Sequence, residues 1–444
     1  MMQWDHLLSP VRYGLEQRVI DTTADARSQF QRDFDRIIFS SPFRRLQNKT
    51  QVFPLPGSVF VHNRLTHSLE VASVGRSIAN KVALSLQQYE AIRNKEVLNE
   101  LGSIVAAACL CHDMGNPPFG HAGEDAISKF FREGAGHQFR DAFTQEQWLD
   151  LTNFEGNANA LRLLTHQFGG RRRGGFALTY TTLASLIKYP FASGWNPQKP
   201  KYGFFQSERE TFLKIARQLD LKQIEQNPLR YARHPLVYIV EAADDICYEI
   251  MDIEDAHKLN ILDREQTFNL MLNFFDPHQD AGFYERKEEV FREVTDINER
   301  VAYLRASVIN KLVDLTYHVF MKHHDQILAG TFQGSLIDYL PEREGKAFDA
   351  CKKLAVSQIY NHRSVVKIEL TGFNVLGTLM EEFTYAVIHS DSQYTRKLLS
   401  LVPQQYTLRT GSTYERIRSV VDFVSGMTDL YAVDLYKDIR GIRI

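Results

Sequence analysis

Four side chains that can bind a metal ion are spread over three separate stretches of the 444-residue sequence. They are two histidines and two aspartates, namely His67, the adjacent pair His112 and Asp113, and Asp244. A mixed nitrogen and oxygen set suits magnesium or a divalent first-row metal, and it leaves positions open for water and substrate oxygens. Such an ion can lower the pKa of its water and bind a phosphoryl oxygen. The residue types therefore point to phosphoester hydrolysis.

Competing catalytic signatures are absent from the sequence. It contains no Gly-x-Ser-x-Gly turn and no phosphate-binding Gly-x-x-x-x-Gly-Lys-Ser/Thr loop. The few, scattered cysteines do not suggest a disulfide framework, and we expect them to be buried as small hydrophobic side chains. They are Cys109, Cys111, Cys247 and Cys351.

Composition predicts a cytoplasmic protein without a membrane span. The net charge of -2 gives no overall attraction to nucleic acid or to a membrane surface, so any such site must be local. No uninterrupted apolar run reaches transmembrane length, and the first residues lack a basic head before an apolar core.

Each metal-competent residue is expected in a helix or at a helix end. A helix should run from His67 to about Gln88, with His67 in its first turn. The small apolar residues from Ala106 should form a buried helix that ends at His112 and Asp113, because the following Gly-Asn-Pro-Pro run cannot continue it. A third buried helix should begin at Pro235.

A polar stripe runs along this third helix. Asp244, Tyr248 and Asp252 recur at every fourth position, so they share one face of an otherwise apolar helix. A carboxylate without a partner is costly in a protein core, so these side chains should meet a cation or line a cleft.

The predicted fold class is mainly α. We expect an irregular arm over 1–20, a helical core over 21–260 and a helical C-terminal region over 261–444. A first helix should be capped near Asp21, Thr22 and Thr23, and the stretch from Ser364 to Leu370 is one candidate strand.

Basic residues gather in two regions. The stretches 43–52 and 62–71 contain arginines whose planar forks match phosphate oxygens. The segment from Gly169 to Gly175 places Arg171, Arg172 and Arg173 between glycine pairs, so it should be a flexible, exposed loop. That loop either serves an anion or another subunit, or is an ordinary solvated loop.

Longer motifs resemble one known family. The sequence resembles the HD-domain phosphohydrolases, whose motif is H…HD…D, and within them the deoxynucleoside triphosphate triphosphohydrolases of the bacterial dGTPase type. The motifs that carry the resemblance are Ser41–Leu46, Lys49–Val52, Arg64–Val71, His112–His121, Glu241–Tyr248 and Ser425–Asp429. The resemblance implies an HD-domain helical core and hydrolysis of a dNTP to a deoxynucleoside and inorganic triphosphate.

The resemblance also implies a role for each matching residue. The implied metal ligands are His67, His112, Asp113 and Asp244. The implied pair that handles the proton and orients the water or the leaving oxygen is His121 and Glu124. Arg64 resembles an α-phosphate contact, and the implied sugar-reading residues are Gln51, Tyr248 and Asp252. A tyrosine ring placed where a 2′ hydroxyl would project excludes ribonucleotides.

Two further sets are less closely defined by the resemblance. Glu381 and Arg418 are candidates for reading the base, with surface salt bridges as the equal alternative. Candidates for holding the triphosphate tail are Arg44, Arg45, Lys49, Lys188 and Lys201. The implied cofactor is a divalent ion, Mg²⁺, Mn²⁺ or Co²⁺. The implied assembly is a ring of dimers, expected to be a hexamer, with single-strand DNA or a dNTP as a candidate effector.

Two other functions stay open at this point. Another HD-type phosphohydrolase would act on a cyclic nucleotide, an alarmone or a nucleoside monophosphate, and the block from Gln51 to Arg64 and Tyr248 disfavours it. A non-catalytic nucleotide sensor or single-strand DNA binding module would use Arg171 to Arg173, and it is disfavoured because no metal ligand is missing.

Overall fold

The computed structural model describes residues 1–18, 26–53, 61–195, 201–406 and 411–442. Helices dominate this part of the chain, and its two short strands, β1 (Gln223–Glu225) and β2 (Arg230–Tyr231), form one antiparallel pair. The predicted mainly α class is therefore confirmed. Among the described residues, no helix is both long enough and apolar enough to cross a membrane.

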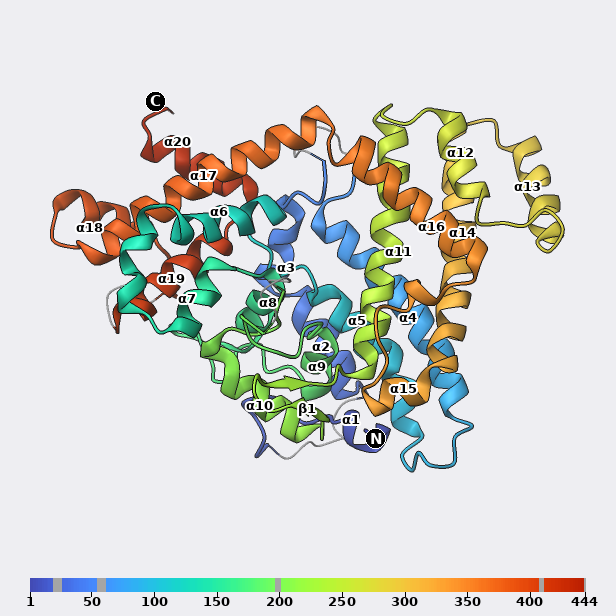
Figure 1. The fold of residues 1–444 in the computed structure, drawn as a ribbon, viewed down its shortest axis with the longest axis horizontal. Helices are drawn as coiled ribbons and strands as arrows, with labels where there is room; N and C mark the ends of the chain where they lie inside the picture. Colours follow the sequence, from blue (N-terminus) through green and yellow to red (C-terminus); the bar gives the residue numbers. More distant parts are fainter. Residues whose placement is uncertain (19–25, 54–60, 196–200, 407–410, 443–444) are drawn as a thin grey trace.

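A first core surrounds the long helix α11 (Pro235–Lys258), which crosses the middle of the molecule in Figure 1. Helix α4 (Arg64–Leu86) packs against α11, α5 (Leu101–Cys111) and α14 (Ile297–Lys322). Helix α5 also contacts α2 (Gln29–Ile38) and α9 (Tyr180–Leu186). Almost every residue of α5 is buried, as its run of small apolar residues predicts.

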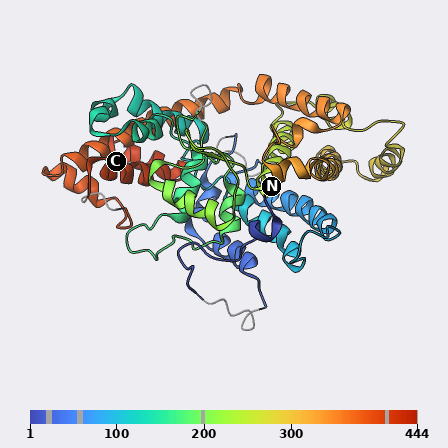
Figure 2. The ribbon, with the colours of Figure 1, turned by 60° about the horizontal axis from the view of Figure 1, so that its bottom comes forward.

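A second core joins the middle of the chain to its C-terminal end. Helix α6 (Gly120–Arg132) packs against α17 (Arg363–Ile388), which in turn contacts α18 (Gln393–Ser400), α19 (Thr413–Ser425) and α20 (Asp429–Ile439). Figures 1 and 2 show the C-terminal residues, in orange and red, on both sides of the molecule. The C-terminal region thus contributes to both cores.

The remaining elements complete these layers. The other helices are α1 (Trp4–Leu7), α3 (Ser41–Arg45), α7 (Gln145–Thr152), α8 (Gly156–Thr165), α10 (Arg209–Gln218), α12 (Arg264–Leu272), α13 (Ala281–Glu293), α15 (His324–Ala329) and α16 (Glu342–Leu354). Short 3-10 turns occupy Leu46–Asn48, Glu96–Glu100, Ala135–Ala142, Gln206–Glu208 and Ile337–Tyr339, and a π-helical turn occupies Ala355–Ile359.

Two local predictions differ from the structure. The stretch from Ser364 to Leu370 is not a strand, because it forms the first turns of α17. The N-terminal segment is not wholly irregular, since it contains α1, and the Trp4 indole donates a hydrogen bond to His324 at 3.0 Å. The predicted cap at 21–23 lies outside the described residues, and α2 begins after Ser28.

A buried ion cluster ties the two cores together. The Arg162 guanidinium on α8 donates to both carboxylate oxygens of Asp422 on α19 at 2.7 Å, and to Glu208 at 2.6 Å. All three side chains are almost completely buried. Burial alone would lower the pKa of Arg162, but the two carboxylates raise it, so the arginine stays charged.

Replacing Arg162 by alanine should destabilise the chain by about 3 to 5 kcal/mol, because two carboxylates would be left buried without their cation. Urea unfolding followed by circular dichroism measures this loss. The control is Lys129→Ala on α6, whose contact with Glu133 is exposed and 3.8 Å long, and it should change stability by less than about 1 kcal/mol. Equal losses in the two variants would contradict the structural role of the cluster.

Candidate functional site

The first turn of α4 places two of the predicted site residues. Asn63 caps this helix by accepting hydrogen bonds from the backbone amides of Leu65 and Thr66, both at 3.0 Å, and the Thr66 hydroxyl accepts from the Asn63 amide in return. Such a reciprocal box fixes where a helix starts. As a result, Arg64 and His67 both project from the first turn and both are buried.

The end of α5 holds His112 in a defined tautomer. Its Nδ1 lies 2.6 Å from the carbonyl oxygen of Cys109, and a carbonyl only accepts, so Nδ1 must carry the proton. In the neutral ring, Nε2 is then left with its lone pair. This Nε2 atom is buried and has no hydrogen bond partner among the described residues. A metal ligand needs such an available ring nitrogen.

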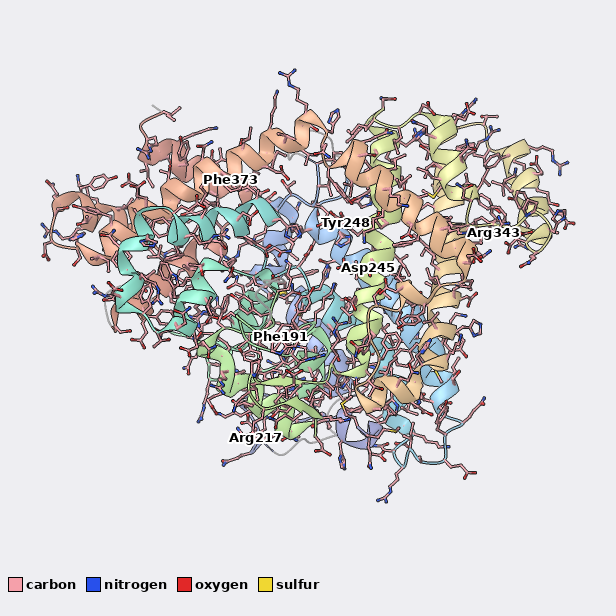
Figure 3. The ribbon with its side chains drawn as sticks, viewed as in Figure 1. Phe191, Arg217, Asp245, Tyr248, Arg343 and Phe373 are labelled. Atoms are coloured by element: carbon pink, nitrogen blue, oxygen red, sulfur yellow. The ribbon has the colours of Figure 1, made fainter. Side chains whose placement is uncertain are left out.

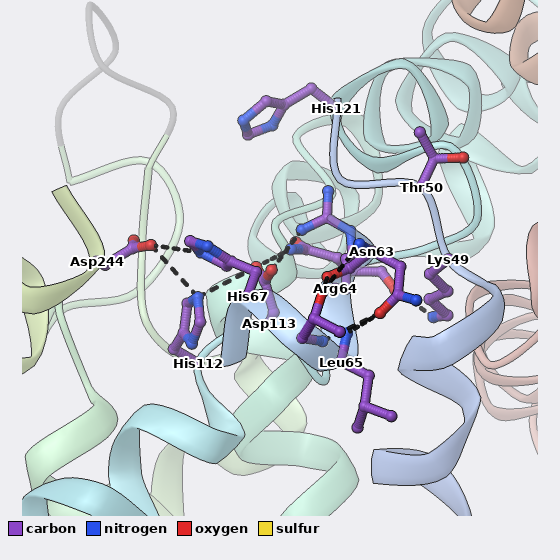
Figure 4. A network of polar contacts seen from close by, with 12 residues as sticks. Lys49, Thr50, Asn63, Arg64, Leu65, His67, His112, Asp113, His121 and Asp244 are labelled. Carbon is purple, nitrogen blue, oxygen red and sulfur yellow. Dashed lines mark hydrogen bonds and ion pairs between the residues drawn. The ribbon is translucent and has the colours of Figure 1, made fainter. Parts of the chain in front are cut away.

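Asp244 on α11 faces both imidazoles, as Figure 4 shows. Its Oδ1 lies 3.0 Å from His67 Nε2 and 3.4 Å from His112 Nε2. Burial alone would raise the pKa of Asp244, but the two histidines hold it well below its usual value. Burial likewise lowers the pKa of His112, yet Asp113 and Asp244 outweigh it and raise that pKa to about 9.

These residues fit a divalent metal ion. Ligand atoms of His67, His112 and Asp113 all lie within 4.8 Å of one another, and Asp244 contacts both histidines. His112 Nε2 has only the 3.4 Å contact with Asp244, and the negative charges of the buried Asp113 and the half-buried Asp244 lie beside it, which are features that a bound cation would satisfy. The structure therefore brings the four predicted metal residues together from three helices.

Arg64 and Asn116 hold the second aspartate. Arg64 Nη1 donates to Asp113 Oδ2 at 2.7 Å, and the Asn116 side chain donates to Asp113 Oδ1 at 2.5 Å. Burial would raise the pKa of Asp113, but Arg64 together with His112 and His67 outweighs this effect and lowers it. Arg64 Nε has no partner among the described residues, and the side chain lines the cavity described below. Arg64 thus has donors available for an anion.

His121 and Glu124 form a pair at the start of α6. His121 Nδ1 lies 2.8 Å from Glu124 Oε2, and Glu124 Oε1 accepts from the Gly156 amide at 2.7 Å. The imidazole side chain is 79% exposed, whereas that of the glutamate is only 9% exposed. The hydrogen bond that His121 donates to Glu124 raises the pKa of the imidazole. The pair can therefore offer a proton to a group bound beside it.

A cluster of aromatic rings closes the other side of the metal set. The ring centroids of Tyr248 and Tyr360 are 5.8 Å apart, and those of His67 and Tyr248 are 6.4 Å apart. The Tyr360 hydroxyl donates to Asp252 Oδ2 at 2.9 Å. Burial raises the pKa of Asp252 well above its ordinary value. This carboxyl is thus partnered by a hydroxyl donor and lies behind the two rings.

All of these groups surround one cavity of about 480 Å³. Predicted site residues that line it are Gln51, Arg64, His112, Asp113, His121, Glu124, Lys188, Lys201, Asp244 and Tyr248. His67 and Asp252 lie behind this lining, in contact with Asp244 and Tyr360 respectively. The Gln51 amide oxygen is buried and without a partner among the described residues, so it has a free acceptor.

Other predicted residues do not line the cavity. Arg44 and Glu381 are exposed elsewhere, and the Arg45 side chain donates to the Gly426 carbonyl. The Lys49 ammonium is buried and donates to the backbone carbonyls of Asn116 and Ser425. Arg418 is fully buried, with its guanidinium 3.6 Å from the centre of the Phe205 ring.

Sequence reasoning assigned completion of the nucleotide pocket to the C-terminal region 261–444, but it named none of the C-terminal residues that line the cavity. Tyr360 and the first turns of α17 line it with Val365, Ile368 and Glu369. The spacing of Val365 and Ile368 is compatible with one face of a helix, and that signal was present in the sequence. No local pattern marks Tyr360, because its role depends on contacts with α11 that are remote in sequence.

Comparisons with known proteins agree with this arrangement. Residues 64–166 match the HD domain family, and residues 339–438 match the phosphohydrolase-associated domain family. The first match contains His67, His112 and Asp113, while Asp244 lies outside both.

Relatives match the chain over nearly its full length. A "deoxyguanosinetriphosphate triphosphohydrolase-like protein" of Synechocystis sp. is 36% identical over 100% of both chains. A protein of the same description from Listeria innocua is 33% identical over 99% of this chain and 100% of its own. A "deoxyguanosinetriphosphate triphosphohydrolase" of Yersinia pseudotuberculosis is 31% identical over 92% of this chain and 93% of its own.

Manganese should raise the thermal stability of the parent chain, because an ion that binds only the folded state stabilises it by mass action. At an ion concentration near 100 times Kd the gain is about 2.7 kcal/mol. In His112→Ala most of that gain should be lost, as measured by differential scanning fluorimetry with and without a chelator. The control, His278→Ala, removes an exposed histidine and should respond as the parent does. An equal response in His112→Ala would exclude this metal site.

Proposed function

The chain belongs to the deoxyguanosinetriphosphate triphosphohydrolase-like family of HD-domain proteins, and we propose that it hydrolyses deoxynucleoside triphosphates to a deoxynucleoside and inorganic triphosphate. The observation that carries this proposal is the convergence of two histidines and two aspartates beside a cavity that also contains Arg64 and the pair His121 and Glu124. Relatives named for dGTP support dGTP as one of the substrates.

The proposed metal ligands are His67, His112, Asp113 and Asp244. When bound there, a divalent ion would supply Lewis acidity to a phosphoryl oxygen and lower the pKa of a nearby water molecule. We propose Mg²⁺, Mn²⁺ or Co²⁺, because hard oxygen donors and imidazole nitrogens are both present.

The remaining steps fall to side chains around the cavity. Arg64 binds the α-phosphate through its free donors, while its bond to Asp113 holds it in place. Water attacks the α-phosphorus and the bond to the 5′ oxygen breaks. His121, kept protonated by Glu124, gives its proton to that oxygen, so the deoxynucleoside leaves neutral. Lys188 and Lys201 are the tail-binding candidates that line the cavity.

Selection for a deoxyribose is assigned to the aromatic side of the cavity. We assign the exclusion of a 2′ hydroxyl to the Tyr248 ring, which lines the cavity, and the contact with a sugar hydroxyl to Gln51, which has a buried acceptor there. Asp252 is reached through Tyr360, so the tyrosine hydroxyl is the nearer contact for a 3′ hydroxyl. Recognition of the base by Glu381 or Arg418 is not supported, because Glu381 is exposed and Arg418 is buried, and neither side chain lines the cavity.

We propose a boundary between the helical core and the C-terminal region at 260/261, because α11 ends at Lys258.

We also propose a homo-oligomer built as a ring of dimers, expected to be a hexamer. An apolar patch on α17 supports it. Val366, Leu370 and Phe373 are 36%, 58% and 36% exposed and share one helix face. Analytical ultracentrifugation of the parent and of Leu370→Lys tests this assembly.

A cytoplasmic location is supported by the cysteines. All four are reduced and buried, which is typical of proteins in reducing compartments. We also propose single-strand DNA or a dNTP as an effector. The exposed side chains of Arg171 and Arg172 support this proposal, because they can contact phosphate groups.

Incubation with each dNTP and Mg²⁺, Mn²⁺ or Co²⁺ should release inorganic triphosphate without orthophosphate, measured by anion-exchange chromatography. Asp244→Ala should lower kcat/KM by at least about a hundredfold, because a ligand of the catalytic ion is lost. The matched control is Asp245→Ala, which removes the neighbouring carboxylate and should retain most activity. Orthophosphate or a 3′-pyrophosphate product would instead favour another HD-type phosphohydrolase.

The pH profile should report the pair at the start of α6. A proton donor with a raised pKa is active below that pKa, and the rate falls as pH rises through it. Glu124→Gln removes the charge that raises the pKa, while its amide oxygen can still accept from Gly156. The basic limb of kcat should therefore move to lower pH. Glu133→Gln, an exposed control on the same helix, should leave the limb in place. A shift of that limb to higher pH in Glu124→Gln would refute the assigned role.

A further inference from the structure

A second cavity, of about 410 Å³, lies at another face of the molecule and plays no part in the proposed reaction. It is formed by the N-terminal segment, the glycine-rich loop before α9, and α10. Its lining residues are Tyr13, Gly14, Glu16, Arg173, Gly174, Tyr180, Lys214, Arg217 and Gln218. Figure 3 shows Arg217 at the lower edge of the molecule, remote from Tyr248.

Two glycines lock the rim of this cavity. Gly14 and Gly174 have φ angles of +77° and +81°, a region that other residues rarely adopt. A Cβ added to Gly14 would lie 2.5 Å from the Gly174 Cα, and one added to Gly174 would collide with the Tyr13 carbonyl oxygen. The two turns therefore pack backbone against backbone. The predicted Arg171 to Arg173 loop is thereby fixed next to the N-terminal segment at Arg173.

Positive charge dominates the lining. The side chains of Arg173 and Lys214 are exposed and make no ion pair or hydrogen bond among the described residues. Arg217 donates to the Leu213 carbonyl of its own helix, and its only ion pair there is an exposed contact with Glu210 at 4.0 Å. Three cations are thus available to an anion that enters the cavity.

The one carboxylate in the lining is already engaged. Glu16 Oε1 accepts from the Gly14 amide at 2.8 Å and from the Tyr180 hydroxyl at 2.7 Å. The Tyr13 hydroxyl is hydrogen bonded to Thr211 at 2.8 Å. The aromatic rings therefore form a fixed wall. Among the described lining residues, one negative charge, that of Glu16 near Lys214, stands against three positive charges.

We propose that this cavity is a second anion site, which binds a polyphosphate group, either inorganic triphosphate or the triphosphate of a nucleotide. Several neighbouring phosphates suit three cations better than a single monovalent anion does. The three cations also lie around one short, open concavity and not along an extended basic track of the kind that a DNA backbone needs, which favours a compact anion.

This site is separate from the catalytic cavity. Helix α9 has Tyr180 at one end, in the second cavity, and Leu186 at the other end, in the catalytic cavity. The two cavities share no lining residue and lie at opposite ends of α9, so they are two separate places. The chain should therefore bind polyphosphate at two places, and the two can be distinguished by substitution.

The test is calorimetric binding of inorganic triphosphate and of dGTP to the full chain in a chelating buffer, where the catalytic site lacks its ion. The parent should bind both ligands. In the double variant Lys214→Ala, Arg217→Ala the Kd should rise at least about tenfold, because two exposed cations are removed without a change in the core. The control, Arg209→Ala, removes an exposed cation of α10 outside the cavity and should bind as the parent does.

Equal binding by the parent and the double variant would overturn the proposal, as would binding of a single-strand oligonucleotide at this place without competition from triphosphate. Comparable Kd values for inorganic triphosphate and dGTP would identify the phosphates as the recognised group, and tighter binding of dGTP would identify a nucleotide as the source. This experiment measures binding and not turnover, so loss of the second anion site would not contradict the proposed hydrolysis. Likewise, absence of hydrolysis would not contradict the second anion site.

Discussion

The structure depends on the placement of Asp244 between two imidazoles inside a helical core. Asp244 is half-buried at the cavity wall, and His67 and His112 approach its carboxylate from α4 and from the end of α5 and offset its negative charge. The approach fixes the crossing of these helices with α11. Small side chains permit it: a Cβ on Gly75 of α4 would lie 2.8 Å from the Cys109 sulfur on α5. The demands of packing and of the charged site therefore select the same helix arrangement.

The proposed metal ligands and the proposed proton-transfer pair belong to different cores. The four metal-competent residues project from helices of the first core, whereas His121 and Glu124 begin α6, which is part of the second. The distance between the metal-competent residues and the pair His121 and Glu124 therefore depends on the contacts that join the two cores. Arg162 with Asp422 is one such joint, and the amide of Gly156, which begins the same helix as Arg162, donates directly to Glu124. The ion cluster and the proposed proton donor are thus parts of one rigid connection.

Sequence patterns predicted the parts of the site that follow from local rules. The helix end at His112 follows from Gly-Asn-Pro-Pro, and the stripe through Asp244 and Tyr248 follows from helical spacing, so both could be found without coordinates. Tyr360 could not, since its ring meets Tyr248 only through the packing of a segment more than a hundred residues later. The stretch from Ser364 to Leu370 alternates like a strand at Val366, Ile368 and Leu370, but it forms the first turns of α17, where Val365 and Ile368 face the cavity and Val366 and Leu370 are exposed.

Lys49 shows why a charged residue in a matching motif need not touch the substrate. Burial lowers the pKa of its ammonium to about 7, despite the opposing effect of Asp429. Its donors are directed to the carbonyl oxygens of Asn116, just after the metal pair, and of Ser425, at the end of α19. An ammonium already bonded to two carbonyls in a dry environment has little to offer a phosphate. Its contacts instead tie the loop after Asp113 to the C-terminal helices, so the motif that contains Lys49 reflects the joining of the two cores.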